Sequence, residues 1–157
     1  MQMGAFVRRT RRIAGLLGLL VLMLPALGAG ERFSALAARA LDSGQNAKLP
    51  PHLSLVLGLG AGDESPPVKQ IATRVGHEVR SFNVCTTNHR NLVIFVYDED
   101  QRLTVAYLLS VAGTLRKAVS YVSGGPPKTL SLSKARPGFE RELQFWSDYE
   151  AAQPPAH

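Results

Sequence analysis

The spacing of apolar residues predicts helices in the first half of the chain. Residues 31–41 carry apolar side chains every three to four positions, which is the spacing of one buried helical face. The same spacing recurs over residues 67–75, where Ser65 is placed to cap a helix and Gly76 to end it. The run at residues 53–59 is mostly apolar and fits either a strand or one buried helical turn. We therefore expect two helices with a third short element between them.

From residue 78 onward the pattern becomes typical of β-strands. The loops at residues 87–90 and 98–101 contain Asn or Asp, and loops this short connect antiparallel neighbours. Residues 92–97 are apolar on both faces, as in a central strand that is covered on both sides. The predicted strands are residues 78–84, 92–97, 103–109 and 115–122, with a short fifth strand at 129–132.

A C-terminal helix is predicted from residue 138 or 139 to residue 151. Its stripe of Phe139, Leu143 and Trp146 is a large apolar surface that can cover a sheet. The sequence therefore predicts one α+β domain over residues 29–151, with N-terminal helices, an antiparallel meander of four to five strands, and a C-terminal helix packed on the sheet. Residues 152–157 are predicted to be a disordered tail.

Residues 1–28 have the features of a cleavable secretory signal peptide. Four arginines between positions 8 and 12 precede an apolar run at residues 13–24, and small residues follow Pro25. Cleavage is expected after Gly28 or Gly30. The alternative is an uncleaved anchor, because the 18 residues from 13 to 30 are at the short limit of a membrane span. We expect an exported protein, periplasmic or extracellular, with no membrane span after cleavage.

Loss of this leader changes the charge of the protein. The whole chain has 18 Lys and Arg against 12 Asp and Glu, and its isoelectric point is near 9.9. Four of the 18 basic residues are leader arginines, so 14 remain against 12 acidic residues, a net charge of +2. Much of the basicity that would indicate a nucleic-acid binder thus belongs to the leader. We expect no nucleic-acid partner.

Cys85 is the single cysteine of the sequence, so the domain has no intrachain disulfide and depends on apolar burial. Its thiol could be buried and inert, joined to another chain, or reactive. In the reactive interpretation, Cys85 and His89 form a nucleophile pair with a carboxylate such as Asp98. Because Cys85 ends an alternating segment of a sheet covered on both faces, we predict a shielded and unreactive thiol.

Three further patterns have candidate ligand chemistry. His77, Cys85 and His89 are potential soft metal ligands, although their spacing matches no established motif. The acidic turn at residues 98–100 offers oxygen ligands for calcium without the EF-hand spacing. The glycine-rich loop at residues 58–62 precedes acidic residues and prolines, which disfavour phosphate binding. We predict no metal and no cofactor.

Residues 101–139 contain basic residues and no acidic ones. On a sheet these side chains could form a face for an acidic partner or for anionic lipid headgroups. The alternative is a solvated surface that is balanced by the acidic C-terminal helix. The candidate binding residues are Arg102, Arg116, Lys117 and Lys128.

No motif in the sequence is specific enough to assign an enzyme class. The favoured interpretation is a small, exported, non-enzymatic binding or accessory protein of the cell envelope, whose partner is another envelope protein or an anionic surface. The alternative is a small thiol-dependent enzyme or hydrolase that uses Cys85 and His89. A pocket containing both residues and a carboxylate would favour this alternative.

Overall fold

The computed structural model describes residues 32–49, 51–59, 65–87, 91–121 and 126–155. The predicted leader lies outside these ranges. In chain order the elements are α1 (Ser34–Ser43), β1 (Gln45–Lys48), α2 (Pro51–Leu57), β2 (Pro67–Val75), β3 (Glu78–Cys85), β4 (Asn91–Tyr97), β5 (Leu103–Ser110), β6 (Leu115–Ser120), β7 (Lys128–Leu130) and α3 (Leu132–Ala151).

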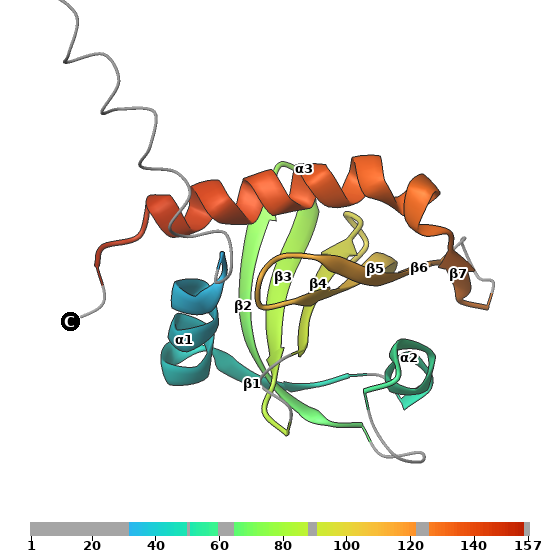
Figure 1. Cartoon of the computed structure of the whole chain (residues 1–157), viewed down its shortest axis with the longest axis horizontal. Coiled ribbons are helices and arrows are strands. Elements are labelled where there is room, and N and C mark those ends of the chain that lie inside the picture. Colours follow the sequence, from blue (N-terminus) through green and yellow to red (C-terminus); the bar gives the residue numbers. More distant parts are fainter. Residues whose placement is uncertain (1–31, 50, 60–64, 88–90, 122–125, 156–157) are drawn as a thin grey trace, which may run out of the picture.

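The seven described strands form one antiparallel sheet in which spatial order follows sequence order, β1 to β7. The long helix α3 crosses one face of this sheet, with α1 beside its C-terminal end (Figure 1). Helix α2 packs on the opposite face, because its apolar residues cluster with the other set of strand side chains. The predicted α+β meander with a C-terminal helix on the sheet is confirmed.

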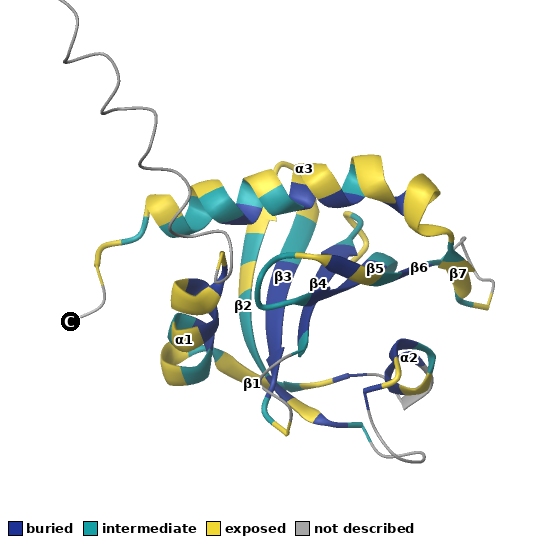
Figure 2. Ribbon diagram, in the orientation of Figure 1, coloured by how far each residue is buried: buried dark blue, intermediate teal, exposed yellow. Residues whose placement is uncertain are grey.

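The sheet is buried on both faces, as the double-sided apolar pattern of residues 92–97 predicts. In β4, Leu92 and Ile94 pack with α1 and α3, whereas Val93 and Phe95 pack with α2. This division follows from the alternation of side chains along a strand. Figure 2 shows the resulting burial, which is concentrated in the central strands β3 and β4.

The strand bounds of the second half agree with the prediction within about two residues, since β3 to β6 follow the predicted segments and β7 the fifth. The helix predicted over residues 67–75 is wrong, because these residues form β2. All eight residues from Val68 to Val75 pair with β3 through a two-residue turn in which Gly76 has a φ of 61°. That backbone angle favours glycine, so Gly76 closes a hairpin instead of ending a helix.

The strand β1 is absent from the prediction, and it raises the number of strands from the predicted four or five to seven. Three of its four residues are polar and exposed, so no apolar pattern marks them. They form a strand because each of the four pairs with a residue of β2. The ambiguous run at residues 53–59 resolves as helix α2.

Helix α3 begins at Leu132, earlier than the predicted residue 138 or 139. Ser131 caps it by accepting the Lys134 N–H at 3.4 Å, and Pro137 lies inside the helix. The aromatic residues of this helix pack on the sheet as predicted: Trp146 is fully buried. Its ring centroid lies 5.6 Å from that of Phe82. Among the described residues, no helix has the length and apolar character to cross a membrane.

Candidate functional site

Cys85 lies at the end of β3 and is fully buried in the core beneath α2. Its Sγ is 3.2 Å from the Thr87 hydroxyl oxygen. His89 lies outside the described residues, so its pairing with Cys85 stays a prediction. Asp98 follows the far end of the β3–β4 hairpin, because Tyr97 pairs with Val79 whereas Cys85 adjoins the opposite turn. The structure therefore separates Cys85 from the carboxylate proposed to act with it.

His77 occupies the exposed turn between β2 and β3, where its Nδ1 is 3.9 Å from the Glu99 carboxylate. Cys85 is at the other end of β3, roughly 25 Å away at about 3.3 Å per residue. The two candidate metal ligands are thus not brought together. Within the described ranges, no three His, Cys, Asp or Glu side chains form a group that could hold a metal ion.

In the acidic turn after β4, the Asp98 carboxylate is hydrogen-bonded to the backbone of the same turn. Asp98 Oδ1 accepts the N–H groups of Asp100 and Arg102 at 3.0 and 2.9 Å. The Arg102 guanidinium is 3.9 Å from the Asp100 carboxylate. These contacts are those of a solvated turn whose charges balance locally.

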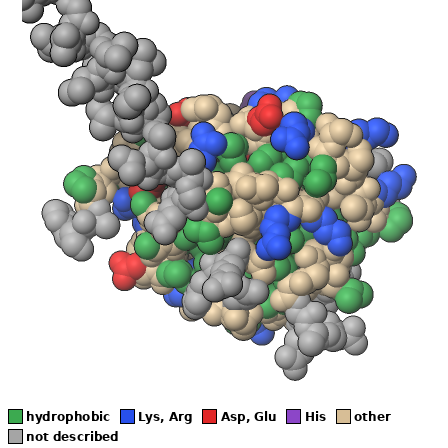
Figure 3. All heavy atoms as spheres, in the orientation of Figure 1, with side chains coloured by type: hydrophobic (Ala, Val, Ile, Leu, Met, Phe, Trp, Pro, Cys, Tyr) green, Lys and Arg blue, Asp and Glu red, His purple; other side chains and the backbone are tan. Residues whose placement is uncertain are grey.

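The four candidate basic residues are dispersed. Arg102 is in the β4–β5 turn, and Lys128 begins the edge strand β7. Arg116 and Lys117 are neighbours in β6, so their side chains point to opposite faces of the sheet. On the face shown in Figure 3, Lys and Arg side chains occupy several places separated by apolar and uncharged surface. Arg116 also borders a shallow hollow of about 460 Å³ at the β5–β6 turn.

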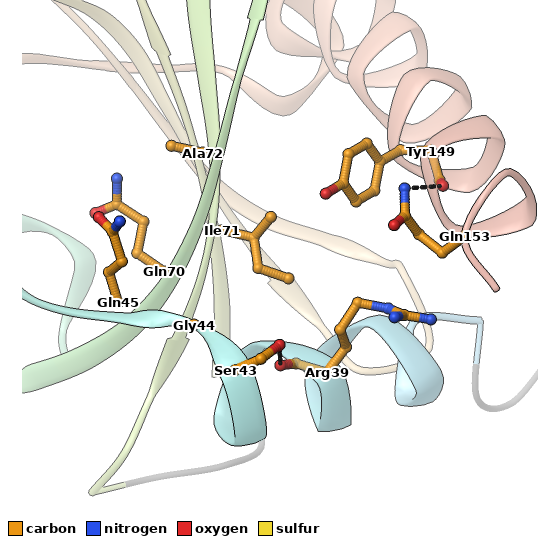
Figure 4. Close-up of a pocket in the computed structure, with 9 residues that line it drawn as sticks. All are labelled: Arg39, Ser43, Gly44, Gln45, Gln70, Ile71, Ala72, Tyr149 and Gln153. Atoms are coloured by element: carbon orange, nitrogen blue, oxygen red, sulfur yellow. Dashed lines mark hydrogen bonds between the residues drawn. The ribbon is translucent and has the colours of Figure 1, made fainter. Parts of the chain in front are cut away.

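A more polar crevice, of about 320 Å³, lies where α1, β1, β2 and the C-terminal part of α3 meet (Figure 4). We call it the edge crevice. Tyr149 of α3 points across it toward Ile71 of β2, while Gln45 and Gln70 lie on the other side of the strand. Gln45 and Gln70 are cross-strand partners, so the pairing of β1 with β2 sets their two amides side by side.

Gly44 places β1 directly after α1 at this crevice. Its N–H donates to the Ala40 carbonyl oxygen at 2.9 Å, which closes the last turn of α1. A Cβ at this position would collide with that same oxygen and would lie 3.0 Å from the carbonyl oxygen of Gln70. Only glycine allows the chain to pass from helix to strand so close to β2.

The one charged side chain among the described lining residues is engaged outside the crevice. Arg39 Nη2 donates to the Pro154 carbonyl oxygen at 2.9 Å, and its Nε is 3.5 Å from a Glu150 carboxylate oxygen. These contacts join α1 to the end of α3, and Figure 4 shows the guanidinium directed away from Gln45 and Gln70. The groups left to meet a ligand are neutral amides and a phenol.

Beside the edge crevice, β2 has an unpaired edge. Strand β1 pairs with β2 only as far as Gln70. The Pro67 carbonyl accepts from the Thr86 N–H at 3.0 Å and so faces β3. Strand alternation then directs the N–H and C=O groups of Gln70, Ala72 and Arg74 toward the β1 side. No described strand pairs with Ala72 or Arg74 on this side, and both residues are exposed.

A buried ion pair joins α3 to the sheet away from this crevice. Arg80 Nε donates to both carboxylate oxygens of Glu142, at 2.9 and 3.0 Å. Burial raises the pKa of Glu142 above its ordinary value of 4.5, and the hydrogen bond and charge of Arg80 oppose this increase. The pair lines neither of the two hollows described above, so its role is to hold the helix.

The edge crevice has no counterpart among the residues predicted from the sequence. It is assembled from α1, β1, β2 and α3, and its glutamines and tyrosine have no motif spacing. The signal that could have revealed it is the polar Gln45–Lys48 segment next to a predicted helix end. Comparison with known proteins adds no assignment, because no family, curated protein or solved structure gives a significant match to this chain.

Proposed function

We propose that the protein is an exported, non-enzymatic binding or accessory protein of the cell envelope, and that the edge crevice is its binding site. The observation that carries the proposal is the combination of a crevice of neutral hydrogen-bonding groups with an exposed strand edge at its side. Exposed, unpaired strand edges bind other chains. Export to the envelope rests on the leader pattern of residues 1–28.

The chemistry of the crevice favours recognition over catalysis. The amides of Gln45, Gln70 and Gln153 donate and accept hydrogen bonds but do not exchange protons as general acids or bases near neutral pH. Arg39 is bonded to the end of α3. The thiol that would support an enzymatic function, Cys85, is fully buried.

A site-specific photo-crosslinker tests this proposal in producing cells. Benzoylphenylalanine replaces Gln70 in the crevice or, as a control, Glu140 on the exposed side of α3. We expect adducts with an envelope component from position 70 and none of these adducts from position 140, identified by mass spectrometry. Identical adducts from both positions, no adduct from position 70, or adducts with cytosolic proteins would contradict the proposal.

A further inference from the structure

We infer that the unpaired edge of β2 and the edge crevice accept an extended peptide, which adds to the sheet antiparallel to β2 and carries an acidic side chain opposite Arg74. The inference rests on the proposed function and specifies its ligand. It combines three observations on the described residues: main-chain groups of β2 that no described strand pairs with, a crevice beside the start of β1, and an exposed cation without a described partner.

The main-chain groups come first, because strand addition depends on them. The outward N–H and C=O groups of Ala72 and Arg74 provide two donors and two acceptors. Both residues are exposed to solvent in the described part of the chain. A peptide paired with them makes the ladder that β1 makes with the first half of β2.

The position of the peptide follows from the position of β1. Gln45 is the first residue of β1 and pairs with Gln70, and the preceding Gly44 ends α1. Gly44 therefore occupies the place opposite Ile71, and the edge of β2 beyond it, at Ala72, borders the edge crevice (Figure 4). A peptide antiparallel to β2 runs in the direction of β1, so its C-terminal residues approach the amides of Gln45 and Gln70.

The side chains of β2 set the sequence that the peptide should have. Ile71 faces the α1–α3 side, where it lines the crevice together with Tyr149. A peptide residue opposite Thr73 shares this face and is expected to be apolar. Arg74 faces the other side, and within the described ranges its guanidinium has no ion pair or hydrogen bond. Opposite charges on facing residues stabilise a strand pair, which favours an acidic residue there.

A second copy of this chain fits the edge less well than a peptide. Two copies of β2 can pair only through residues 72–75, since Gln45 and Gly44 already occupy the positions opposite Gln70 and Ile71. A symmetric pairing centred on Thr73 places each Arg74 opposite Ala72 of the partner subunit, which provides no complementary charge. It also directs the partner's hairpin turn at the crevice and Gln45. A short free strand has no such turn.

The test uses two blocked peptides of alternating Thr and Val, one with a central Glu and one with a central Lys, titrated into the purified full-length protein. We expect the Glu peptide to bind about tenfold more tightly than the Lys peptide, because one cross-strand charge pair changes from attractive to repulsive. Arg74→Glu should reverse this order. The reversal requires no loss of binding, so it cannot result from misfolding.

A second pair of variants tests the main-chain contacts. Ala72→Pro removes an N–H that points away from β3, so the β2–β3 ladder is retained, and Ala72→Val is the control that keeps the N–H. We expect the proline variant to lose binding of both peptides by about tenfold or more, and the valine variant to retain it. Circular dichroism verifies that both variants are folded.

Several results would overturn the inference. The first is an unchanged peptide preference in Arg74→Glu, and the second is unchanged binding in Ala72→Pro. The third is a concentration-dependent dimer that Ala72→Pro disperses, because it would assign the edge to a second copy. If position 70 crosslinks to an envelope component while neither peptide binds, the proposed function stands and the peptide ligand is wrong. If both experiments fail, both proposals are wrong.

Discussion

At the scale of single residues, Cys85 takes its chemical character from its place in β3. It lies in the core beneath α2 and is fully buried. A reagent can reach the thiol only after the core opens. We therefore predict slow labelling by a thiol reagent in the native protein and rapid labelling after denaturation. Rapid native labelling, or a disulfide-linked dimer on a non-reducing gel, would contradict this prediction.

Glu142 illustrates how one buried carboxyl group makes stability depend on pH. Its native pKa is raised, chiefly by burial, with the Glu78 charge adding to this effect and Arg80 and Arg141 opposing it. Between the ordinary value of 4.5 and the higher native value, the folded state binds more protons than the unfolded state. The contribution of this group to the free energy of unfolding is therefore greatest below that window and decreases as the pH rises through it.

The variant Glu142→Gln separates this contribution from the rest of the molecule. In this variant, the free energy of unfolding, measured with denaturant at several pH values across the window, should no longer show the pH dependence that Glu142 causes. The variant should be at least as stable as the wild type near neutral pH, because it removes a carboxylate whose burial disfavours its charged form in the native state. A variant with the same pH slope as the wild type would show that Glu142 does not titrate in this way.

At the scale of elements, α3 is held on the sheet by its aromatic residues. Trp146 is fully buried between the ring of Phe82 on β3 and the rings of its helix neighbours Phe145 and Tyr149. Trp146→Ala should reduce the free energy of unfolding by about 3–5 kcal/mol, as for other buried aromatic residues. The exposed Glu140→Ala in the same helix is the control and should change little. Unchanged thermal stability of Trp146→Ala would rule out the docked helix.

Pro137 and Gly138 should respond in opposite directions when replaced by alanine. Pro137 lies inside α3 and has no N–H for the helical bond to the Ser133 carbonyl, so Pro137→Ala should stabilise the protein by about 1–3 kcal/mol. At Gly138 a Cβ would lie 2.5 Å from the Tyr107 hydroxyl oxygen. Gly138→Ala should therefore destabilise the protein, although alanine is the better helix former. Thermal unfolding of the two variants decides this, and a destabilised Pro137→Ala would contradict it.

Strands β3 to β6 could be predicted because their alternation and short loops are local signals. Strand β2 could not, because its apolar residues are also spaced like a helical stripe. The pairing of Ile71 with Phe82 and the positive φ of Gly76 decide the outcome, and both depend on the hairpin as a whole. Strand β1 has a single apolar residue, Ala47, and no pattern in its sequence predicts its pairing with β2.

The same limit applies to the candidate site. The sequence draws attention to Cys85 and His77, which are chemically distinctive residues, and the structure places them at opposite ends of β3. The edge crevice depends on Gln45, Gln70 and Tyr149, which are common residues far apart in the chain. Their relation follows only from the β1–β2 register and from the docking of α3, and neither is a local property of the sequence.

At the scale of the whole molecule, two cores on opposite faces of one sheet stabilise a domain whose single cysteine cannot form an intrachain disulfide. The curved meander has helices α1 and α3 on one face and α2 on the other (Figure 1). Most side chains of the central strands β3 and β4 are buried in these two cores. The surfaces left for recognition are the sheet edges and the exposed sides of the helices, which is why the unpaired part of β2 is the favoured binding surface.

The last prediction concerns the proposed leader, which carries four of the basic residues of the chain. We propose that the four arginines before the apolar run hold this end on the cytoplasmic side and that the small residues at positions 26 and 28 form a cleavage motif. Mass spectrometry of exported protein should therefore find an N-terminus between Ala29 and Glu31. Gly28→Leu should impair cleavage by removing one of the small residues, whereas the neighbouring Leu27→Val should not. An intact Met1 on membrane-embedded wild-type protein would mean that the apolar run is an anchor and that the basic leader stays with the mature chain.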